Sequence, residues 1–527
     1  MHPRRDRRRR NCCSLSIPTE KSVDMSVSQE LLNFIYVYWK WMFPLFGVAY
    51  LVSNRFQKGL YRVPGPWLNS FSTLPRMWSV YKGKHHLEDL ELHARYGKVV
   101  RVAPNLVLVS DTSEINQIYG INTQFIKSPF YDLSAVYDNE GLVPDTFVLR
   151  QNKALHSRMK RNAANAYSVN GLMQFEPWID PVIVKLLSIF DRHAASGTAF
   201  DMGDMLKRFA MDAVCSLTFG SDFNYLEKGD EMKFLKSMSL FTAYMSIFGH
   251  VAWLHPILLG NPYIARIVSG GDSSNDAMLE ISSHELGKFR ESPPAEGDAM
   301  TFLSRLALNQ STNPKLITDR EILTHAFGNI SAGSDTTAIA MGSVIYHLLV
   351  NRAAYDRLAD EIRSQLSLPV GFQEANALPY LKAVVQEAMR MHPSVGQVLG
   401  RIVPPAGATV GGFKIGAGAE VGMSPWVLHR DPEVFPDPDS FKPERWILGE
   451  GVRDEEHLRQ MNRSFFSFGH GTHTCTGKHI SLMEVTKLIP TLLLRYDLEL
   501  AEVGQTLKFN NWWFTQHHDL RAKITRR

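Results

Sequence analysis

Cysteine is scarce in this sequence, and a strong charge bias is missing. The 527-residue chain contains four cysteines, Cys12, Cys13, Cys215 and Cys475, which are too few for a disulfide framework. The formal net charge is only +4, and residues 1–10 hold six Arg and one Asp, so the rest of the chain is close to neutral. A nucleic-acid-binding surface would have to lie entirely in this short Arg-rich tail, and we expect none.

After Trp67 the sequence also lacks internal repeats and low-complexity linkers, and its amino-acid composition does not change along the chain. Hydrophobic residues make up 44% of the chain and charged residues 21%, which allows a sizeable core and excludes a disordered protein. The simplest division is an Arg-rich tail (1–30), a membrane helix (31–53), a proline-containing hinge (54–66) and one large domain (67–527).

A long apolar run lies near the N-terminus. At about 1.5 Å per residue, residues 31–52 would cross a bilayer core of roughly 30 Å, although Lys40 and Pro44 interrupt them. No small-residue cleavage site follows, which favours a retained single-pass helix over a signal peptide. Basic residues flank the run on both sides, and a start at Met25 would resolve that conflict and leave the body in the cytosol. A second uncharged run, 237–260, is interrupted by Gly, His and Pro, which indicates a pair of apolar helices rather than another span.

The remaining periodicity predicts a mainly α fold with a small β region. Apolar residues recur at helical spacing over 177–193, 207–217, 319–350 and 353–366. Residues 99–109 resemble a hairpin broken at Pro104 and Asn105, and 401–421 combines β-type residues with glycine turns.

The most specific pattern surrounds Cys475. Residues 468–477 read Phe-Gly-His-Gly-Thr-His-Thr-Cys-Thr-Gly, and a helical pattern begins at Lys478. Free amides and the dipole of a helix N-terminus favour a sulfur anion, and glycines let the backbone approach a flat cofactor closely. The loop therefore fits a thiolate ligand of haem iron, with Phe468 shielding the sulfur from water.

Three other interpretations of this loop stay open. Cys475 could be a structural buried thiol. A zinc site could form from His470, His473 and Cys475, although it lacks a convincing fourth ligand. A phosphate loop could use Gly469 and Gly471, although the Lys-Ser/Thr ending and a preceding strand are missing.

An acid and a hydroxyl stand side by side in the longest helical pattern, within Ala332–Thr337 (Ala-Gly-Ser-Asp-Thr-Thr). A mid-helix Gly costs about 1 kcal/mol relative to Ala, and the hydroxyls beside it can reroute backbone hydrogen bonds and open a groove. Asp335 and Thr336 would form a short proton relay there. The alternative is a helix that merely bends.

The loop 468–477 resembles the haem-binding loop of the cytochrome P-450 family, and further family motifs precede it in the expected order. They are Ala332–Thr337, Glu387–Arg390 (Glu-Ala-Met-Arg) and residues 441–446 (Phe-Lys-Pro-Glu-Arg-Trp). The match extends from about Pro64 to Arg527. Residues 425–432 and 441–446 are most similar to fungal, pisatin-demethylase-like members that act in secondary metabolism or detoxification.

The resemblance implies the cytochrome P-450 fold and a role for each matching residue. Cys475 is the implied axial ligand, and Asp335 and Thr336 are implied to deliver protons to bound dioxygen. The implied cofactor-binding residues are Phe468, Gly469, His473, Gly477, His156, Lys160 and Arg401. Which of Arg158, Lys160 and Arg161 contacts the haem propionates stays open. The implied structural network behind the haem consists of Glu387, Arg390 and Arg445.

The resemblance also implies a monooxygenase that uses haem b, dioxygen and NADPH through a separate flavoprotein reductase. Lys478 and Arg463 are weak candidates for the reductase contact. A small apolar substrate would contact the segments 119–143, 241–258, 327–332, 394–399 and 511–514. The implied location is the endoplasmic reticulum membrane, with the catalytic domain in the cytosol. The alternatives are an oxygen-independent isomerase or dehydratase on the same haem and a non-catalytic haem-binding membrane protein.

Overall fold

The structure is a computed structural model, and it divides the chain into two units. It describes residues 25–138, 141–150, 152–164, 166–167, 171, 173–268, 274–293, 299–452 and 454–527. The compact units are Met1–Ser53 and Asn54–Arg527. Most of the predicted Arg-rich tail, with Cys12 and Cys13, lies outside the described residues. The predicted hinge belongs to the larger unit.

Helix α1 (Met25–Phe56) contains the whole predicted membrane segment, with Pro44 inside it. It exposes large apolar side chains such as Trp41 and Phe43, which are 74% and 71% accessible. Across the part of the chain that the structure describes, no helix is both long enough and apolar enough to span a bilayer. The transmembrane helix predicted from the sequence is therefore not shown.

Helices dominate the larger unit, as predicted. The longer ones are α2 (Leu74–Tyr81), α3 (His85–Tyr96), α5 (Lys153–Ala163), α7 (Glu176–Ser196), α8 (Met202–Phe219), α10 (Phe234–Phe248), α12 (Ser274–Glu291), α13 (Phe302–Thr312), α14 (Asp319–Val350), α15 (Arg352–Gln365), α17 (Pro379–Met391), α19 (Glu455–Ser464) and α20 (Lys478–Arg495). The shorter ones are α4 (Ile115–Tyr119), α9 (Tyr225–Lys228), α11 (Pro262–Val268), α16 (Phe372–Ala375) and α18 (Pro425–Leu428). The four helices predicted from periodicity are confirmed as α7, α8, α14 and α15. The second uncharged run forms α10 and the 3-10 segment η6 (Gly249–Ile257).

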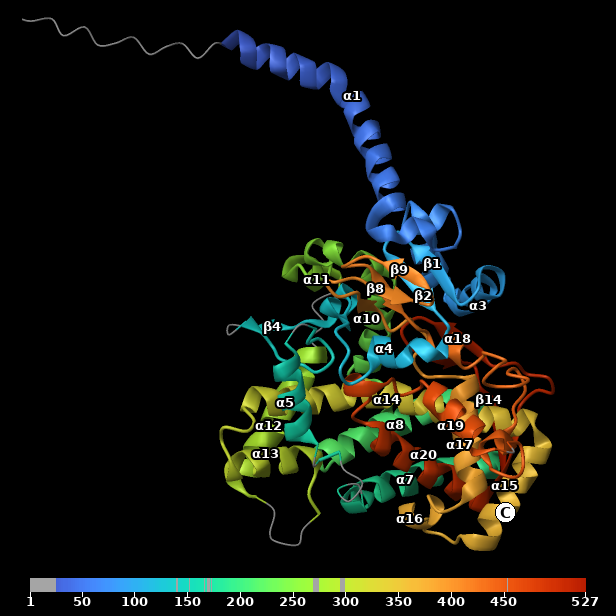
Figure 1. The fold of residues 1–527 in the computed structure, drawn as a ribbon. Coiled ribbons are helices and arrows are strands. Elements are labelled where there is room, and N and C mark those ends of the chain that lie inside the picture. The colour runs from blue at the N-terminus through green and yellow to red at the C-terminus, as the bar shows by residue number, and fades with distance from the viewer. Residues whose placement is uncertain are drawn as a thin grey trace, which may run out of the picture. The chain divides into compact units, whose positions relative to one another are not determined.

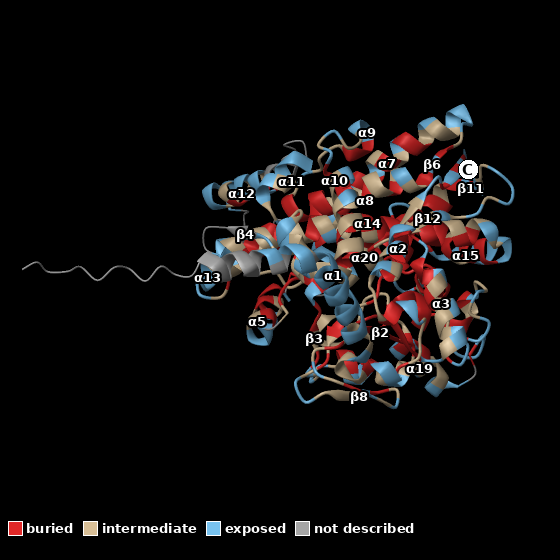
Figure 2. Ribbon diagram, turned by 90° about the horizontal axis from the view of Figure 1, so that it is seen from above, coloured by how far each residue is buried: buried red, intermediate tan, exposed pale blue. Residues whose placement is uncertain are grey.

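Helix α14 is the centre of the apolar core. It begins with a capping box, in which Thr318 and Glu321 satisfy each other's backbone amides. It packs against α8, α12, α13, α17 and α20, and α8, α14 and α20 lie side by side in Figure 1. Buried residues gather on α8 and α14, whereas α11 and α12 expose residues on their outer sides (Figure 2). The middle of α14 is thereby held in the interior from several sides.

A small sheet positions two basic residues. Its strand order is β1 (Val99–Ala103), β2 (Leu106–Val109), β10 (Glu420–Gly422), β7 (Arg401–Ile402) and β3 (Ile126–Lys127). The predicted hairpin over 99–109 is confirmed, because β1 and β2 pair antiparallel. Strands β3 and β7 also pair antiparallel, with Lys127 directly opposite Arg401.

The other strands form four smaller sheets. These are β11 (Tyr496–Leu500), β14 (Arg521–Arg526) and β6 (Phe200–Asp201); β12 (Lys508–Asn511) and β13 (Thr515–His518); β4 (Tyr137–Asp138) and β5 (Gly141–Leu142); and β8 (Ala408–Val410) and β9 (Phe413–Ile415). The β8–β9 hairpin lies in the region where glycine turns predicted strands. The β12–β13 hairpin matters for the site, because its turn carries Trp513 and Phe514.

Candidate active site

The loop before α20 brings Cys475 to the helix N-terminus. The amide of Cys475 donates to the carbonyl of Phe468 over 2.9 Å, which closes the loop. Gly469 and Gly471 adopt φ values of +68° and +64°, in the left-handed region that favours glycine. A Cβ atom at Gly471 would also overlap the carbonyl of Tyr119. The glycines are thus required by backbone geometry.

The Cys475 side chain is accessible to solvent, although enough protein lies around its sulfur for burial to affect the thiol. Burial raises the pKa of the Cys475 thiol, while the amides of Gly477 and Lys478 and the charges of Lys160 and Lys478 act in the opposite direction. The protein's own groups therefore favour a thiolate without fully overcoming burial. A bound metal cation would complete the stabilisation, because metal ligation deprotonates cysteine.

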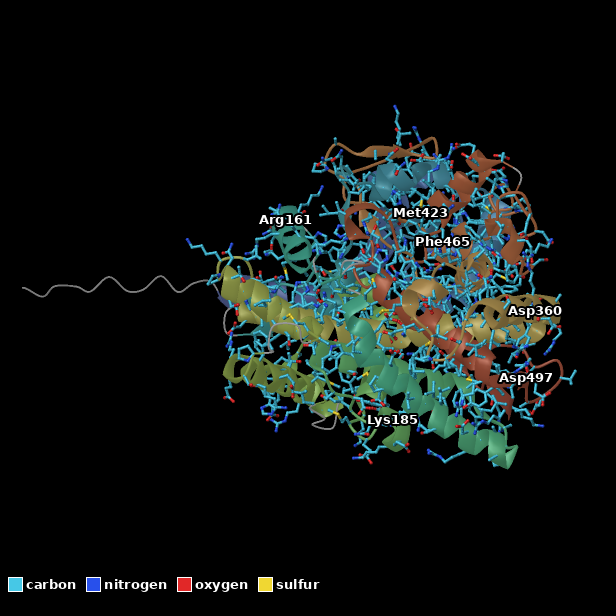
Figure 3. The ribbon with its side chains drawn as sticks, turned by 90° about the horizontal axis from the view of Figure 1, so that it is seen from below. Arg161, Lys185, Asp360, Met423, Phe465 and Asp497 are labelled. Carbon is cyan, nitrogen blue, oxygen red and sulfur yellow. The ribbon has the colours of Figure 1, made fainter. Side chains whose placement is uncertain are left out.

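A buried histidine that sequence reasoning missed connects this loop to α17. His429 donates from Nδ1 to the carbonyl of Arg390 over 2.9 Å, and its Nε2 accepts from the amide of Phe466 over 2.7 Å. The ring stacks on Phe465, with centroids 5.4 Å apart, and Phe465 is labelled in Figure 3. Ser467 adds a hydroxyl bond to the carbonyl of Met389 over 3.0 Å. These contacts fix the start of the Cys475 loop.

Five basic side chains gather beside the loop, and none of them forms an ion pair with a carboxylate among the described residues, although Asp145 acts on Lys127 and Glu420 on Arg401. Four of them were predicted from the sequence, and the fifth, Lys127, was missed. The rings of His156 and His473 have centroids 4.4 Å apart. Burial, followed by the charges of Lys127, Lys160 and Arg401, lowers the pKa of His156 to about 4, and burial with the same neighbours lowers that of His473 well below its usual range. Burial, then Arg401, lowers the pKa of Lys127 to about 7. The cluster would be stabilised by an anionic group.

The three candidate cations of α5 point to different places. Lys160 donates to the carbonyls of Thr472 and Thr474 over 2.8 and 2.7 Å, so it contacts the Cys475 loop itself. Arg158 forms an ion pair with Glu321 over 2.5 Å. Arg161 is exposed on α5, as Figure 3 illustrates. Among these three, Lys160 is the residue in the site.

On α14, Asp335 and Thr336 lie next to each other but bond elsewhere. The Thr336 hydroxyl donates to the carbonyl of Ala332 over 2.7 Å, within a helix that stays continuous. The Asp335 carboxylate instead pairs with Lys207 over 3.0 Å and accepts from Gln516 over 2.9 Å. Asp335 and Thr336 thus do not contact each other through their side chains, as a direct proton relay would require.

Helices α14 and α20 touch in this region, because the hydroxyl of Thr337 donates to that of Ser481 over 3.0 Å. Ala332 is exposed although it stands in the middle of a buried helix. Ala332 on α14 and Cys475, three residues before the start of α20, are thus both accessible side chains.

The predicted structural network is fully assembled. Glu387, Arg390 and Arg445 are buried, at 0%, 0% and 5% accessibility. Glu387 accepts from Arg390 over 2.8 and 3.0 Å, from Arg445 over 2.9 Å and from Trp446 over 2.9 Å. Burial opposes ionisation of Glu387, but the two guanidinium groups outweigh it and hold the pKa of its carboxyl below the ordinary value. This is a satisfied buried ionic network.

An aromatic cluster joins four of the five segments expected to contact a substrate. Its members from these segments include Phe130, Tyr131, Phe241, Tyr244, Phe248, Val395, Leu399, Trp513 and Phe514. Trp513 is central, with its ring centroid 5.2 Å from that of Phe130 and 6.1 Å from that of Tyr131. The fifth segment, 327–332, lies on α14 outside this cluster.

The zinc interpretation of the loop is wrong. Within the described ranges, no three His, Cys, Asp or Glu side chains are placed to hold a metal ion together. Of the candidate reductase contacts, Arg463 already pairs with Glu456 over 2.7 Å, and Lys478 lies 5.5 Å from the Phe468 ring centroid.

The residues present fit haem. Haem offers one metal ion to a single protein ligand, a flat face to glycine-rich backbone, and two carboxylates to cations. Cys475, the loop glycines and the basic cluster supply these three needs in one place. The buried Nδ1 of His473 also has no protein partner, which leaves a polar atom for the cofactor.

Comparison with known proteins agrees with this chemistry. Residues 64–524 match the model of the cytochrome P-450 family. The chain is 36% identical to the cytochrome P-450 monooxygenase cicH of Emericella nidulans, over 89% of this chain and 95% of that protein. It is 33% identical to a cytochrome P-450 monooxygenase of Aspergillus flavus, over 88% and 92%. It is 35% identical to the cytochrome P-450 monooxygenase mpaDE of Penicillium roqueforti, over 88% of this chain but only 55% of that protein. The chain therefore belongs to the cytochrome P-450 family and is a monooxygenase similar to the fungal members of secondary metabolism.

Proposed function

We propose that this monooxygenase holds haem b through Cys475 and inserts one oxygen atom of dioxygen into a small apolar molecule. The observation that carries the proposal is the accessible thiol at the start of α20, next to five clustered basic side chains. When bound, thiolate-ligated haem iron supplies dioxygen binding and O–O bond cleavage. The chain's own residues hold the cofactor, exclude water and supply protons.

Each part of the site has a distinct task in this proposal. The amides of Gly477 and Lys478 stabilise the sulfur anion, and Phe468 keeps water from it. The cations Lys127, Lys160 and Arg401, with His156 and His473, hold the propionates. Thr336 and Asp335 pass protons toward the reacting oxygen. Glu387, Arg390 and Arg445 keep the scaffold behind the haem in place.

The aromatic cluster is the proposed substrate contact surface. Phe130, Tyr131, Trp513 and Phe514 are buried aromatic residues with few polar groups, and such surroundings favour an apolar molecule. The proposed roles are fungal secondary metabolism or detoxification of such molecules.

Electrons are proposed to come from a separate NADPH-dependent flavoprotein reductase, because the chain carries no flavin or nicotinamide fingerprint. Lys478 remains the better candidate for that contact, since Arg463 is already paired. We also propose that α1 associates with the endoplasmic reticulum membrane through its exposed aromatic side chains, with the larger unit in the cytosol.

Replacing Thr336 with Ala tests the proposed reaction. With reductase, NADPH and labelled dioxygen, the native chain should place one labelled oxygen atom in its product. The variant should consume NADPH at a similar rate, but about 10–100-fold less of it should appear as product, because proton delivery is misdirected and hydrogen peroxide forms. Unchanged product formation without reductase or dioxygen would instead identify an isomerase or dehydratase.

Replacing Lys127 with Met tests the missed member of the cluster. Loss of a hydrogen bond to a charged group costs about 1.5–3 kcal/mol, so haem should leave the protein roughly 10–100-fold more readily. Transfer of haem to an excess of an apo-haem protein measures this. The matched control is Lys153→Met, because the ammonium group of exposed Lys153 bonds, among the described residues, only the carbonyl of Thr123. Equal rates of haem loss from both variants would show that Lys127 does not help to hold the haem.

A further inference from the structure

Gln397 carries a buried amide that the fold itself does not use. The residue is 1% accessible, and among the described residues neither its Oε1 nor its Nε2 has a hydrogen-bond partner. Most buried polar side chains in proteins are paired, because an unpaired one lowers the stability of the fold. Such a cost is typical of functional sites, and it is explained if a ligand supplies the missing partner.

The contacts of the neighbouring residues show which way the Gln397 side chain points. Val395 and Leu399 both pack against the aromatic cluster. Gly396 and Val398 face the other way, the first toward the end of β12 and the second toward β1 and β2. Because the contacts alternate along this extended segment, Gln397 lies on the same side as Val395 and Leu399. Its amide is therefore directed toward the proposed substrate surface.

The surroundings of this amide are aromatic. Phe130, Trp513 and Phe514 are buried in the cluster and carry no hydroxyl group. Tyr131 does carry one, but its oxygen accepts from Arg401 over 3.4 Å and so lies toward the basic side chains. Gln397 thus offers hydrogen bonds beside rings that favour an aromatic molecule.

The amide also selects the chemistry of its partner. It offers donors at Nε2 and an acceptor at Oε1, and a hydroxyl group offers both functions in return. A ketone would accept from Nε2 but leave Oε1 unpaired. A carboxylate is disfavoured, because a neutral amide does not compensate a buried charge.

We propose that Gln397 is a specificity-determining residue that hydrogen-bonds a hydroxyl group on an aromatic substrate. The inference rests on the proposed function, because it takes the aromatic cluster as the substrate contact surface. The rings bury the body of the molecule, and Gln397 fixes its orientation through the hydroxyl group. An analogue without the hydroxyl binds less well, because it leaves the buried amide unpaired.

The test compares two probes that differ in one group of similar size, 2-naphthol and 2-methylnaphthalene. Equilibrium dialysis against the purified full chain gives a dissociation constant for each probe and needs no turnover. In Gln397→Leu the ratio of the two constants should shift about five- to tenfold in favour of 2-methylnaphthalene, the factor expected for the loss of one neutral hydrogen bond. Gln386→Leu is the matched control, because the Gln386 amide bonds Asn462 over 3.0 Å. This control should keep the native ratio.

Urea unfolding separates recognition of a ligand from a structural role. Gln397→Leu should unfold at the same or a higher urea concentration, because its amide has no hydrogen bond to lose within the described chain. A lower midpoint, or a ratio that stays native, overturns the inference alone. If neither probe binds the native chain, the aromatic cluster is not a substrate surface, and the inference fails with that part of the proposed function. A chain without haem whose preference for 2-naphthol still depends on Gln397 would contradict the proposed reaction but support the inference.

Discussion

Replacing Glu387 with Ala should lower the free energy of unfolding by about 3–5 kcal/mol, because two buried guanidinium groups would lose their shared carboxylate. Arg390 and Arg445 are 0% and 5% accessible, and within the described ranges their other hydrogen bonds go to backbone carbonyls, such as those of His429 and Pro436. The loss is a large part of the 5–15 kcal/mol that typically holds a domain together. Urea unfolding followed by circular dichroism measures it, together with the haem content of the purified protein.

Glu456→Ala is the matched control for this prediction. Glu456 also contacts two arginines, Arg459 over 3.0 Å and Arg463 over 2.7 Å, but its side chain is 65% accessible. Exposed ion pairs contribute about 0–1 kcal/mol, so this variant should keep nearly all of its stability and haem. If Glu387→Ala were equally stable, the buried network would not be the scaffold of the site.

Replacing His429 with Leu should detach the start of the Cys475 loop from α17. The carbonyl of Arg390 and the amide of Phe466 would each lose a buried partner, at a cost of about 1–3 kcal/mol per group. The sulfur would then be held less firmly, so part of the purified protein should lose the thiolate-type spectrum with carbon monoxide. His457→Leu is the control, because the ring of half-buried His457 bonds the carbonyl of Val434 and, among the described residues, no atom of the loop. Native spectra from both variants would show that His429 does not position the ligand.

Sequence reasoning predicted the parts of this site whose neighbours are close in the chain. The Cys475 loop and the acid–hydroxyl pair are each a short run of residue types that the chemistry requires. Helix α14 was predicted from end to end, because its apolar period is long.

The residues that were missed act through distant partners. Lys127 meets Arg401 only because β3 and β7 pair, and His429 meets Phe466 only because the loop folds onto α17. Lys207 and Asp335 are likewise joined by the packing of α8 on α14. A single Lys or His in a helix or loop carries no local signal for such contacts. The membrane helix, in contrast, was predicted from a strong local signal, the apolar run near the N-terminus. Lys40 and the many aromatic residues of that run lower its mean hydropathy below that of a typical membrane span.

The central claim is that Cys475 binds haem iron as a thiolate. The most direct measurement is the absorption difference spectrum of the dithionite-reduced protein with carbon monoxide, recorded beside Cys475→Ser. The account predicts a strongly red-shifted Soret band in the native chain and its loss in the variant. A folded native protein without any haem band, or a variant that keeps the red-shifted band, would contradict it.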